Sequence, residues 1–238
     1  MGVRGRERER QVEQMAGVWR HREVHGRRER ETPVGQMPGV WRRGGGALGL
    51  GARAGGVSVI RPPRSDELER LREIEREAGR LFVDVGMPEI AADEPPPLAV
   101  LERCRAEGWA WVVTADADGD TLADDGVPVG YVIVDVLDEP GPGRSAHVEQ
   151  VSVDPAFAGR RLGQRLLDHV ADQARRRGLD AVTLTTFRDV PWNAPYYERC
   201  GFRVLAGDEL GPGLRRVRDA ETVHGLDPAQ RVCMRRDL

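Results

Sequence analysis

The chain contains no lysine, so all 36 of its basic side chains are arginines, which we interpret as the mark of a GC-rich genome rather than of chemistry. Cysteine is scarce as well. The three that are present, Cys104, Cys200 and Cys233, match neither a disulfide framework nor the spacing of metal ligands. We therefore expect no metal site.

Long apolar runs are also missing. The longest, Val127–Val136, falls well short of the roughly 20 residues that a membrane-spanning helix needs. The N-terminus is charged and lacks the apolar core of a signal peptide. We expect a protein with no membrane partner that works in the cytoplasm.

Charge divides the chain into two parts. Residues 1–56 hold 12 Arg and 6 Glu, whereas residues 57–238 hold the other 24 arginines and 33 acidic residues, a formal net charge of −9. An acidic body argues against a nucleic acid as the main ligand of the folded part. It suits a cationic substrate.

The first part contains a short direct repeat, since residues 14–20 (QMAGVWR) recur as residues 36–42 (QMPGVWR). Its composition buries too little apolar surface to offset the entropy of ordering. Two interpretations stay open: a disordered basic arm that contacts acidic partners, or upstream DNA translated from a start codon assigned too early. We favour the second, and we place the folded domain at residues 57–238.

From Val57 onward, apolar periodicity predicts regular elements. Helices are expected after Ser65 as N-cap, through Cys104, and over residues 161–177 and 194–199. Strands are expected over 57–61, 109–114, 127–136, 146–153, 181–186, 202–205 and 231–235, with a loop over 84–97 and a part-helical insertion over 207–229. This order indicates one α/β domain with a mixed, largely antiparallel sheet flanked by helices.

The most informative segment is a strand that runs through a glycine-containing turn directly into an amphipathic helix, over residues 151–167. The free backbone N–H groups and the dipole at such a helix start form an anion site. A glycine there lets a phosphate approach the backbone closely. The segment therefore predicts a phosphate-binding turn.

This segment resembles the pyrophosphate-binding motif of the GNAT superfamily of N-acetyltransferases. Gly163 occupies the second glycine position of that motif, whereas Arg161 stands where the first glycine is expected and Ala158 replaces an Arg or Gln. Downstream, residues 194–202 (APYYERCGF) are similar to the Tyr-Glu-x-x-Gly-Phe signature of the same superfamily.

The resemblance implies a sheet that splays at its middle and acetyl-CoA as cosubstrate. The pantetheine arm would lie in the splay and pair with free strand amides, and a backbone N–H near Val151 would polarise the thioester carbonyl. The residues expected to contact acetyl-CoA are Val151, Ser152, Val153, Gly159, Arg160, Arg161, Leu162, Gly163, Gln164 and Asn193.

Candidate catalytic residues lie on the same strand and in the downstream signature. His147 and Glu149 are two apart, which predicts that both project from one side of the strand together with Val151 and Val153. The run from Ser145 to Glu149 is similar to a segment of arylalkylamine N-acetyltransferases in which two histidines relay a proton. Either His147 or Glu149 is then the general base, and the resemblance makes Tyr197 the general acid. We expect Tyr196 to serve in packing and His169 to be solvated.

The acceptor is inferred from charge. Acidic residues in the first-helix region and the insertion favour a primary amine of a small cationic molecule. These residues are Asp84, Glu89, Asp93, Glu94, Asp208, Glu209, Asp219 and Glu221. Two alternatives stay open, a non-catalytic domain that senses acyl-CoA and a protein N-terminal acetyltransferase. A homodimer stays open as well.

Overall fold

The computed structural model describes residues 60–115, 125–139 and 143–238. The predicted segment 1–56 and the predicted domain boundary at Val57 lie outside these residues.

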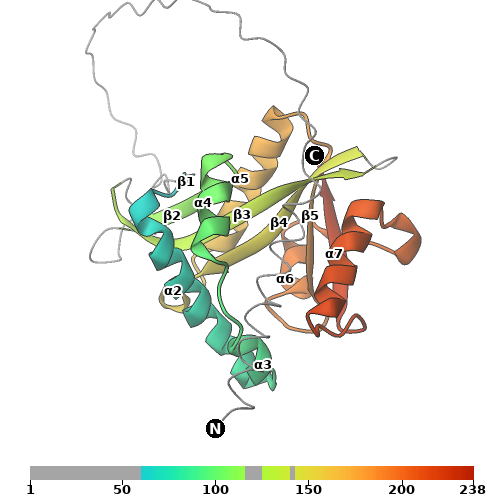
Figure 1. Cartoon of the computed structure of the whole chain (residues 1–238), viewed down its shortest axis with the longest axis horizontal. Coiled ribbons are helices and arrows are strands. Elements are labelled where there is room, and N and C mark those ends of the chain that lie inside the picture. The colour runs from blue at the N-terminus through green and yellow to red at the C-terminus, as the bar shows by residue number, and fades with distance from the viewer. Residues whose placement is uncertain (1–59, 116–124, 140–142) are drawn as a thin grey trace, which may run out of the picture.

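One seven-stranded sheet forms the centre of the molecule, in the order β1-β2-β3-β4-β5-β7-β6 (Figure 1). Neighbouring strands are antiparallel except β4 and β5, which are parallel. The predicted mixed, mostly antiparallel sheet is therefore confirmed. The strands are β1 (Ile60–Arg61), β2 (Ala110–Ala115), β3 (Val127–Glu139), β4 (Gly143–Val153), β5 (Ala181–Phe187), β6 (Arg203–Val204) and β7 (Arg231–Asp237).

Helices α2 (Leu68–Gly79) and α4 (Leu98–Ala106) cover one face of the sheet. In α2 the apolar residues Leu68, Leu71 and Ile74 recur at helical spacing, and all three are buried. The expected N-cap is wrong. Ser65 begins a 3₁₀ helix, η1 (Ser65–Glu67), because the Glu67 carboxylate accepts a hydrogen bond from the Arg64 N–H at 2.7 Å and so caps this start itself.

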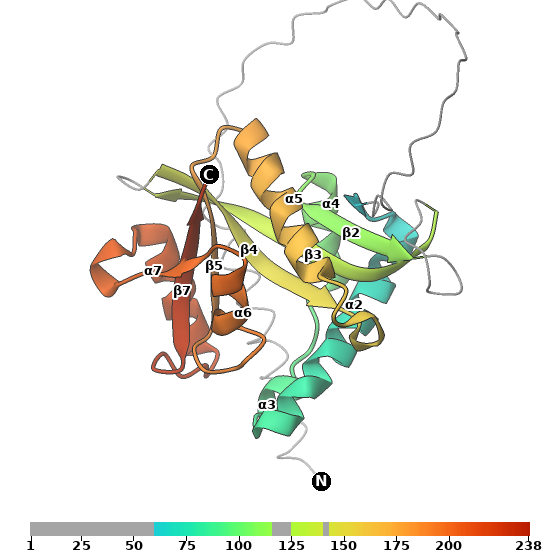
Figure 2. The same ribbon diagram turned by 180° about the vertical axis from the view of Figure 1, so that it is seen from behind.

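The other face is covered by α5 (Leu162–Arg176) and α6 (Ala194–Arg199), as Figure 2 shows. Leu166, Leu167 and Val170 of α5 are fully buried against the strands. His169 does not have the solvated position expected for it. It is half-buried, with its ring centroid 5.2 Å from that of Trp111, and this burial lowers its pKa.

The segment expected to be a loop over 84–97 carries short helices, and the insertion over 207–229 is part-helical, as expected. The segment after α2 holds a 3₁₀ helix, η2 (Arg80–Val85), and then α3 (Pro88–Ala91). The insertion before β7 holds a 3₁₀ helix, η4 (Gly207–Glu209), and then α7 (Pro212–Val223), on the same side of the sheet as α2 (Figure 1). A last 3₁₀ turn, η3 (Pro155–Phe157), links β4 to α5.

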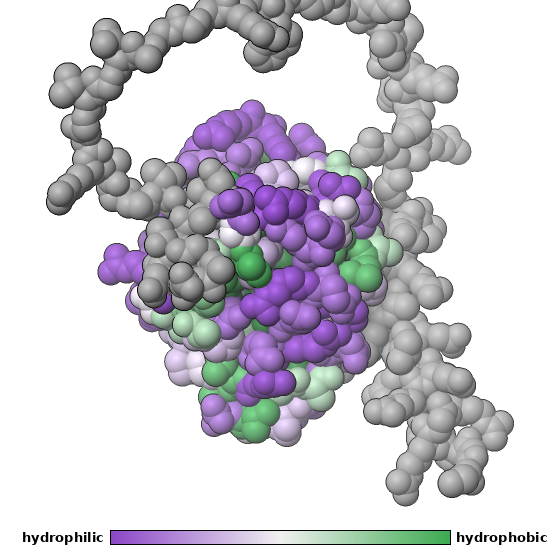
Figure 3. Space-filling model, turned by 90° about the vertical axis from the view of Figure 1, so that its left-hand side faces the viewer, coloured by the Kyte–Doolittle hydropathy of each residue, from purple (hydrophilic) through white to green (hydrophobic). Residues whose placement is uncertain are grey.

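The surface on the α2 side is largely hydrophilic, and its apolar residues form small separate patches (Figure 3). Within the described residues, no helix combines the length and apolarity that crossing a membrane requires.

Candidate active site

The two parallel strands at the centre of the sheet separate part-way along their length. β4 and β5 pair only from Ser145↔Ala181 to Val148↔Leu184. Beyond that point β4 stays paired with β3 as far as Val153, and β5 stays paired with β7 as far as Phe187. Beyond Val148 and Leu184 the two strands no longer pair with each other. What we call the strand gap is the space between residues 149–153 of β4 and residues 185–187 of β5. The predicted splay is confirmed.

A β-bulge at Glu149 marks the start of the strand gap. Val148 lies opposite Val134 and Gln150 lies opposite Ile133, so Glu149 is an extra residue in β4. The extra residue reverses the alternation of side chains along the strand. The expectation that Val151 and Val153 share a side with His147 is therefore wrong, since both valines pack into the core beneath α5, the face that Ala146 and Val148 also occupy.

His147 lies at the closed end of the strand gap, in the part of β4 that is still paired with β5. Its imidazole is buried, and its Nδ1 is 3.1 Å from the hydroxyl oxygen of Thr183. That hydroxyl is also 3.2 Å from Ser145 Oγ. Glu149, the first residue beyond the pairing, is partly exposed.

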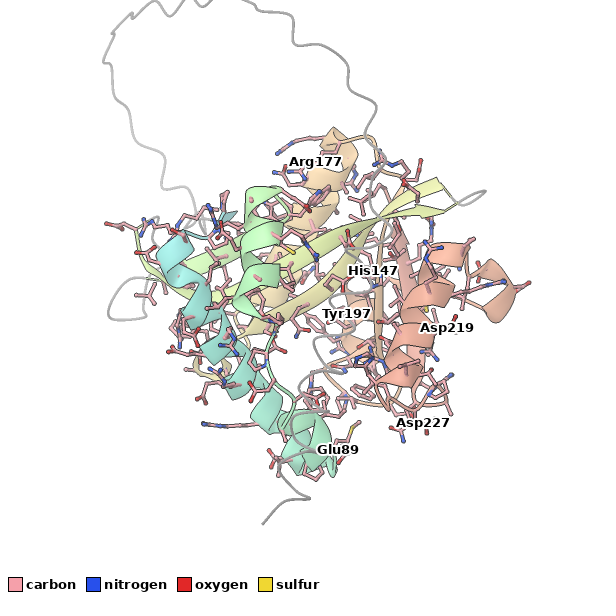
Figure 4. All side chains as sticks on the ribbon, in the orientation of Figure 1. Glu89, His147, Arg177, Tyr197, Asp219 and Asp227 are labelled. Atoms are coloured by element: carbon pink, nitrogen blue, oxygen red, sulfur yellow. The ribbon has the colours of Figure 1, made fainter. Side chains whose placement is uncertain are left out.

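Tyr197 extends from α6 toward the middle of the sheet, and Figure 4 shows it and His147 between α2 and α7. Its ring packs edge-on against those of Tyr196 and Phe202. Burial raises the pKa of Tyr197 far above its usual value, and the Glu75 carboxylate raises it further. The phenol is therefore protonated at neutral pH, as a general acid must be.

The predicted phosphate-binding turn is built as an exposed loop followed by the start of α5. Gly159 has a φ of 78°, and Arg161, the N-cap, has a φ of 58°. Arg161 thus adopts the left-handed conformation at the position where the motif usually has glycine. Arg160 and Arg161 are exposed, and the Arg160 guanidinium lies 5.0 Å from the centroid of the Phe157 ring.

Within the first turn of α5, Gly163 contacts Tyr196. A Cβ at Gly163 would stand 2.8 Å from the Tyr196 hydroxyl oxygen, closer than atoms pack. Tyr196 also packs against the core under α5, as expected for a packing residue. Leu162 is buried and Gln164 is partly exposed.

Two residues expected to bind the cofactor, Ser152 and Asn193, make hydrogen bonds within the protein. Ser152 Oγ donates a hydrogen bond to Glu75 of α2, so its hydroxyl proton is already used within the protein. Asn193 is the N-cap of α6 without a capping side-chain bond, and its carbonyl oxygen accepts from the N–H groups of Tyr196 and Tyr197.

Glu75 is the feature of the site that the sequence analysis missed. Its carboxylate accepts hydrogen bonds of 2.7 Å each from the Tyr131 hydroxyl, the Gln150 amide and the Ser152 hydroxyl. Burial raises its pKa, although these three donors act to lower it. A signal was available, because Glu75 lies four residues after Leu71, on the apolar stripe of α2, where a helix of this kind calls for another apolar residue.

Of the predicted acidic residues, Glu221 of α7 reaches the strand gap. Its carboxylate accepts hydrogen bonds from Thr185 and from the Arg231 guanidinium. Glu89 and Asp219 lie toward the periphery (Figure 4). Asp93 is close enough to Glu89 and to His224 for both charges to affect its pKa, which burial raises.

A cavity of about 350 Å³ opens between β6, β7 and α7. Ser145 and Thr183, the partners in the His147 network, form one of its walls, and Arg203 and Arg235 form another. None of its lining residues comes from 149–153 or 185–187, so we treat it as separate from the strand gap. In the described part of the chain no cluster of His, Cys, Asp and Glu could hold a metal ion.

A model of the acetyltransferase (GNAT) family matches residues 69–202, more than half of the chain and all of the strand gap. The chain belongs to the GNAT acetyltransferase family. The segments that carry the match are those that build the gap and the helices beside it, from α2 to α6.

Individual relatives agree with this assignment. The chain is 30% identical over 95 residues to an uncharacterised N-acetyltransferase of Methanocaldococcus jannaschii, covering 39% of this chain and 42% of that protein. It is 40% identical over 60 residues to a glucosamine 6-phosphate N-acetyltransferase of Oryza sativa subsp. japonica, covering 25% and 34%. The matches thus span less than half the length of either curated relative.

Among solved structures, N-acetylglutamate synthase of Neisseria gonorrhoeae, complexed with coenzyme A and N-acetyl-glutamate, has the same fold. The TM-score is 0.55 at 16% sequence identity, covering 78% of this chain and 36% of that one. At this identity the likeness concerns the GNAT fold alone.

Proposed function

We propose that this protein transfers the acetyl group of acetyl-CoA directly to the primary amine of a small cationic molecule. The observation that carries the proposal is the strand gap with the start of α5 beside it, since η3 and the loop after it lead from the end of β4 straight into that helix. Membership of the GNAT family supports the same reaction.

In this proposal the first turn of α5 binds the diphosphate of acetyl-CoA. Backbone N–H groups over residues 159–164, with the positive end of the helix dipole, supply the anion site. The guanidinium groups of Arg160 and Arg161 are exposed on the loop at this helix start, where they would contact the phosphates. The pantetheine arm then lies in the strand gap, along the edge of β4 that has no strand partner over residues 149–153.

The chemistry follows from that placement. The acceptor ammonium gives up a proton, with Glu149 or His147 as the base named by resemblance, and the amine nitrogen attacks the thioester carbon. The backbone N–H near Val151 stabilises the oxyanion. When the carbon–sulfur bond breaks, Tyr197 protonates the thiolate.

A cationic acceptor is supported by the carboxylates that border the strand gap, Glu75 on the α2 side and Glu221 on the α7 side. Arg231 is paired with Glu221, so the second carboxylate is partly neutralised. Glu75 has no such ion pair among the described residues, and we choose a small amine over a protein N-terminus as the acceptor.

A panel of amines tests the proposal. Purified protein and acetyl-CoA are mixed with small diamines, monoamines, amino acids and short peptides, and the release of free thiol is followed. The three cysteines of the chain are buried, which keeps the thiol background low. We expect the highest kcat/KM with a small diamine. Fastest release with peptides would favour the protein N-terminal acetyltransferase, and binding of coenzyme A without release for any amine would favour a sensing domain.

A further inference from the structure

We infer that Glu75 binds the ammonium group of the acceptor and takes its proton before attack. The inference rests on the proposed acetyl transfer, and it assigns the role of base to a residue other than Glu149 and His147. It follows from where the Glu75 carboxylate is held, from the charge that its partners leave on it, and from the groups opposite it.

Glu75 is fixed against the part of β4 that borders the strand gap. Two of its three hydrogen-bond donors, Gln150 and Ser152, belong to the unpaired stretch 149–153, and the third, Tyr131, lies opposite Ser152 on β3. Three bonds of 2.7 Å hold both carboxylate oxygens in one orientation. Glu75 nevertheless remains partly exposed as a residue.

The partners of Glu75 leave its charge uncompensated. Tyr131, Gln150 and Ser152 are all neutral donors, and no ion pair with Glu75 is found among the described residues, in contrast to Glu67, which pairs with Arg61, and Glu221, which pairs with Arg231. A carboxylate withdrawn from water without a counter-ion is costly. An ammonium group on the acceptor would supply the missing positive charge.

The groups around Glu75 suit the transfer that follows. The surrounding elements carry several titratable or charged groups. Among them are Tyr131 of β3, Cys104 of α4, His147 and Glu149 of β4, Tyr197 of α6 and Arg231 of β7. Tyr197 lies near enough to Glu75 for the carboxylate to raise its pKa. A proton acceptor on α2 and a proton donor on α6 thus stand on opposite sides of the strand gap.

The steps balance. One N–H bond of the ammonium breaks as its proton passes to a Glu75 oxygen, and the freed lone pair forms the bond to the thioester carbon. The attacking nitrogen, now positively charged, loses its second proton to solvent. The carbon–sulfur bond then breaks, its electron pair stays on sulfur, and Tyr197 gives up its proton to the thiolate. Solvent returns a proton to Tyr197 and removes one from Glu75. Because burial raises the pKa of Glu75, its carboxylate is a better proton acceptor than a solvated one.

Glu75→Gln tests the role, with Glu73→Gln as the matched control on the exposed side of the same helix. For Glu75→Gln we expect kcat/KM for the best amine to fall by about 100-fold or more. Its dissociation constant for acetyl-CoA should stay within about twofold of the wild type, because the interaction that is lost is with the acceptor and its transition state rather than with the cofactor. Glu73→Gln should keep both values.

The pH profile separates a base from a structural anchor. The acid limb of kcat/KM should follow deprotonation of Glu75. Ser152→Ala removes a donor that lowers the Glu75 pKa, so it should move that limb to higher pH. If Glu75 had a purely structural role, Glu75→Gln and Ser152→Ala would both lower the melting temperature, and the acid limb of kcat/KM would not move in Ser152→Ala.

Three outcomes have distinct meanings. Wild-type protein that releases no thiol with any amine overturns the proposed function and this inference together. Active wild type with a Glu75→Gln variant that keeps at least a third of its kcat/KM overturns the inference alone. An unmoved acid limb in Ser152→Ala likewise assigns the proton to another group, Glu149 or His147.

Discussion

Among individual residues, Tyr197 has two properties that a general acid needs: its ring is held in place, and its phenol is protonated at neutral pH. It is held by ring contacts with Tyr196 and Phe202, and its buried phenol stays protonated well above neutral pH. The ordinary pKa of a thiol is about 8.5, below that of the phenol, so proton transfer from Tyr197 to the thiolate is uphill and is completed when solvent reprotonates the phenol.

Replacing Tyr197 with Phe removes the proton and keeps the ring. We expect kcat to fall by about 100-fold, with the affinity for acetyl-CoA nearly intact because the ring contacts persist. Steady-state kinetics with the best amine and calorimetric titration with acetyl-CoA measure the two quantities. Unchanged turnover would remove Tyr197 from the mechanism.

Arg161 holds a conformation that suits glycine. With φ at 58°, a side chain with a Cβ costs about 1 kcal/mol, and a β-branched one costs more. We expect Arg161→Gly to match or exceed the wild type in free energy of unfolding, and Arg161→Val to lose about 1 kcal/mol or more. Urea denaturation gives the order. A valine variant as stable as the wild type would show that the turn does not keep this conformation.

At the scale of elements, α5 and α6 approach each other closely where Gly163 faces Tyr196. Gly163 in the first turn of α5 leaves room for the Tyr196 hydroxyl, and without that oxygen the nearest atom to a new Cβ would be the Tyr196 Cζ at 3.6 Å, an ordinary contact. The spacing of these two helices therefore depends on a small residue facing a phenol.

This contact predicts that the effect of Gly163→Ala on the free energy of unfolding changes sign when the Tyr196 hydroxyl is removed. Gly163→Ala should destabilise the wild-type protein by about 1 kcal/mol, because the new methyl group displaces Tyr196. In a Tyr196→Phe background the same change should stabilise it by about 0.5–1 kcal/mol, the helix preference of alanine over glycine. The double-mutant cycle is measured by urea denaturation. Equal effects in both backgrounds would contradict the contact.

Element order could be predicted from the sequence because it depends on local apolar periodicity. The stripe of α5 and the run of β4 were clear from their residues alone. The bulge at Glu149 could not be predicted, since one extra residue is visible only in the register with β3, and its effect is to move Val151 and Val153 to the other face. Glu75 shows the same limit. Its neighbours Gln150 and Ser152 lie far along the chain, and only the tertiary fold brings them to α2.

At the scale of the whole molecule, the strand pairings that build the candidate site join residues that follow Ile60. We therefore expect removal of residues 1–56 to leave both the denaturation midpoint and kcat/KM unchanged. Full-length and shortened proteins are compared side by side. A large loss of either quantity would mean that the basic segment takes part in folding or catalysis.

Hydrogen exchange with and without acetyl-CoA tests most directly whether the cosubstrate is held by the first turn of α5 and by the open edge of β4. The account predicts that amides in 149–153 and 159–164 gain protection when acetyl-CoA is added, while those of β6 and α7 do not. Protection confined to other parts of the molecule, or none over these two stretches, would contradict it.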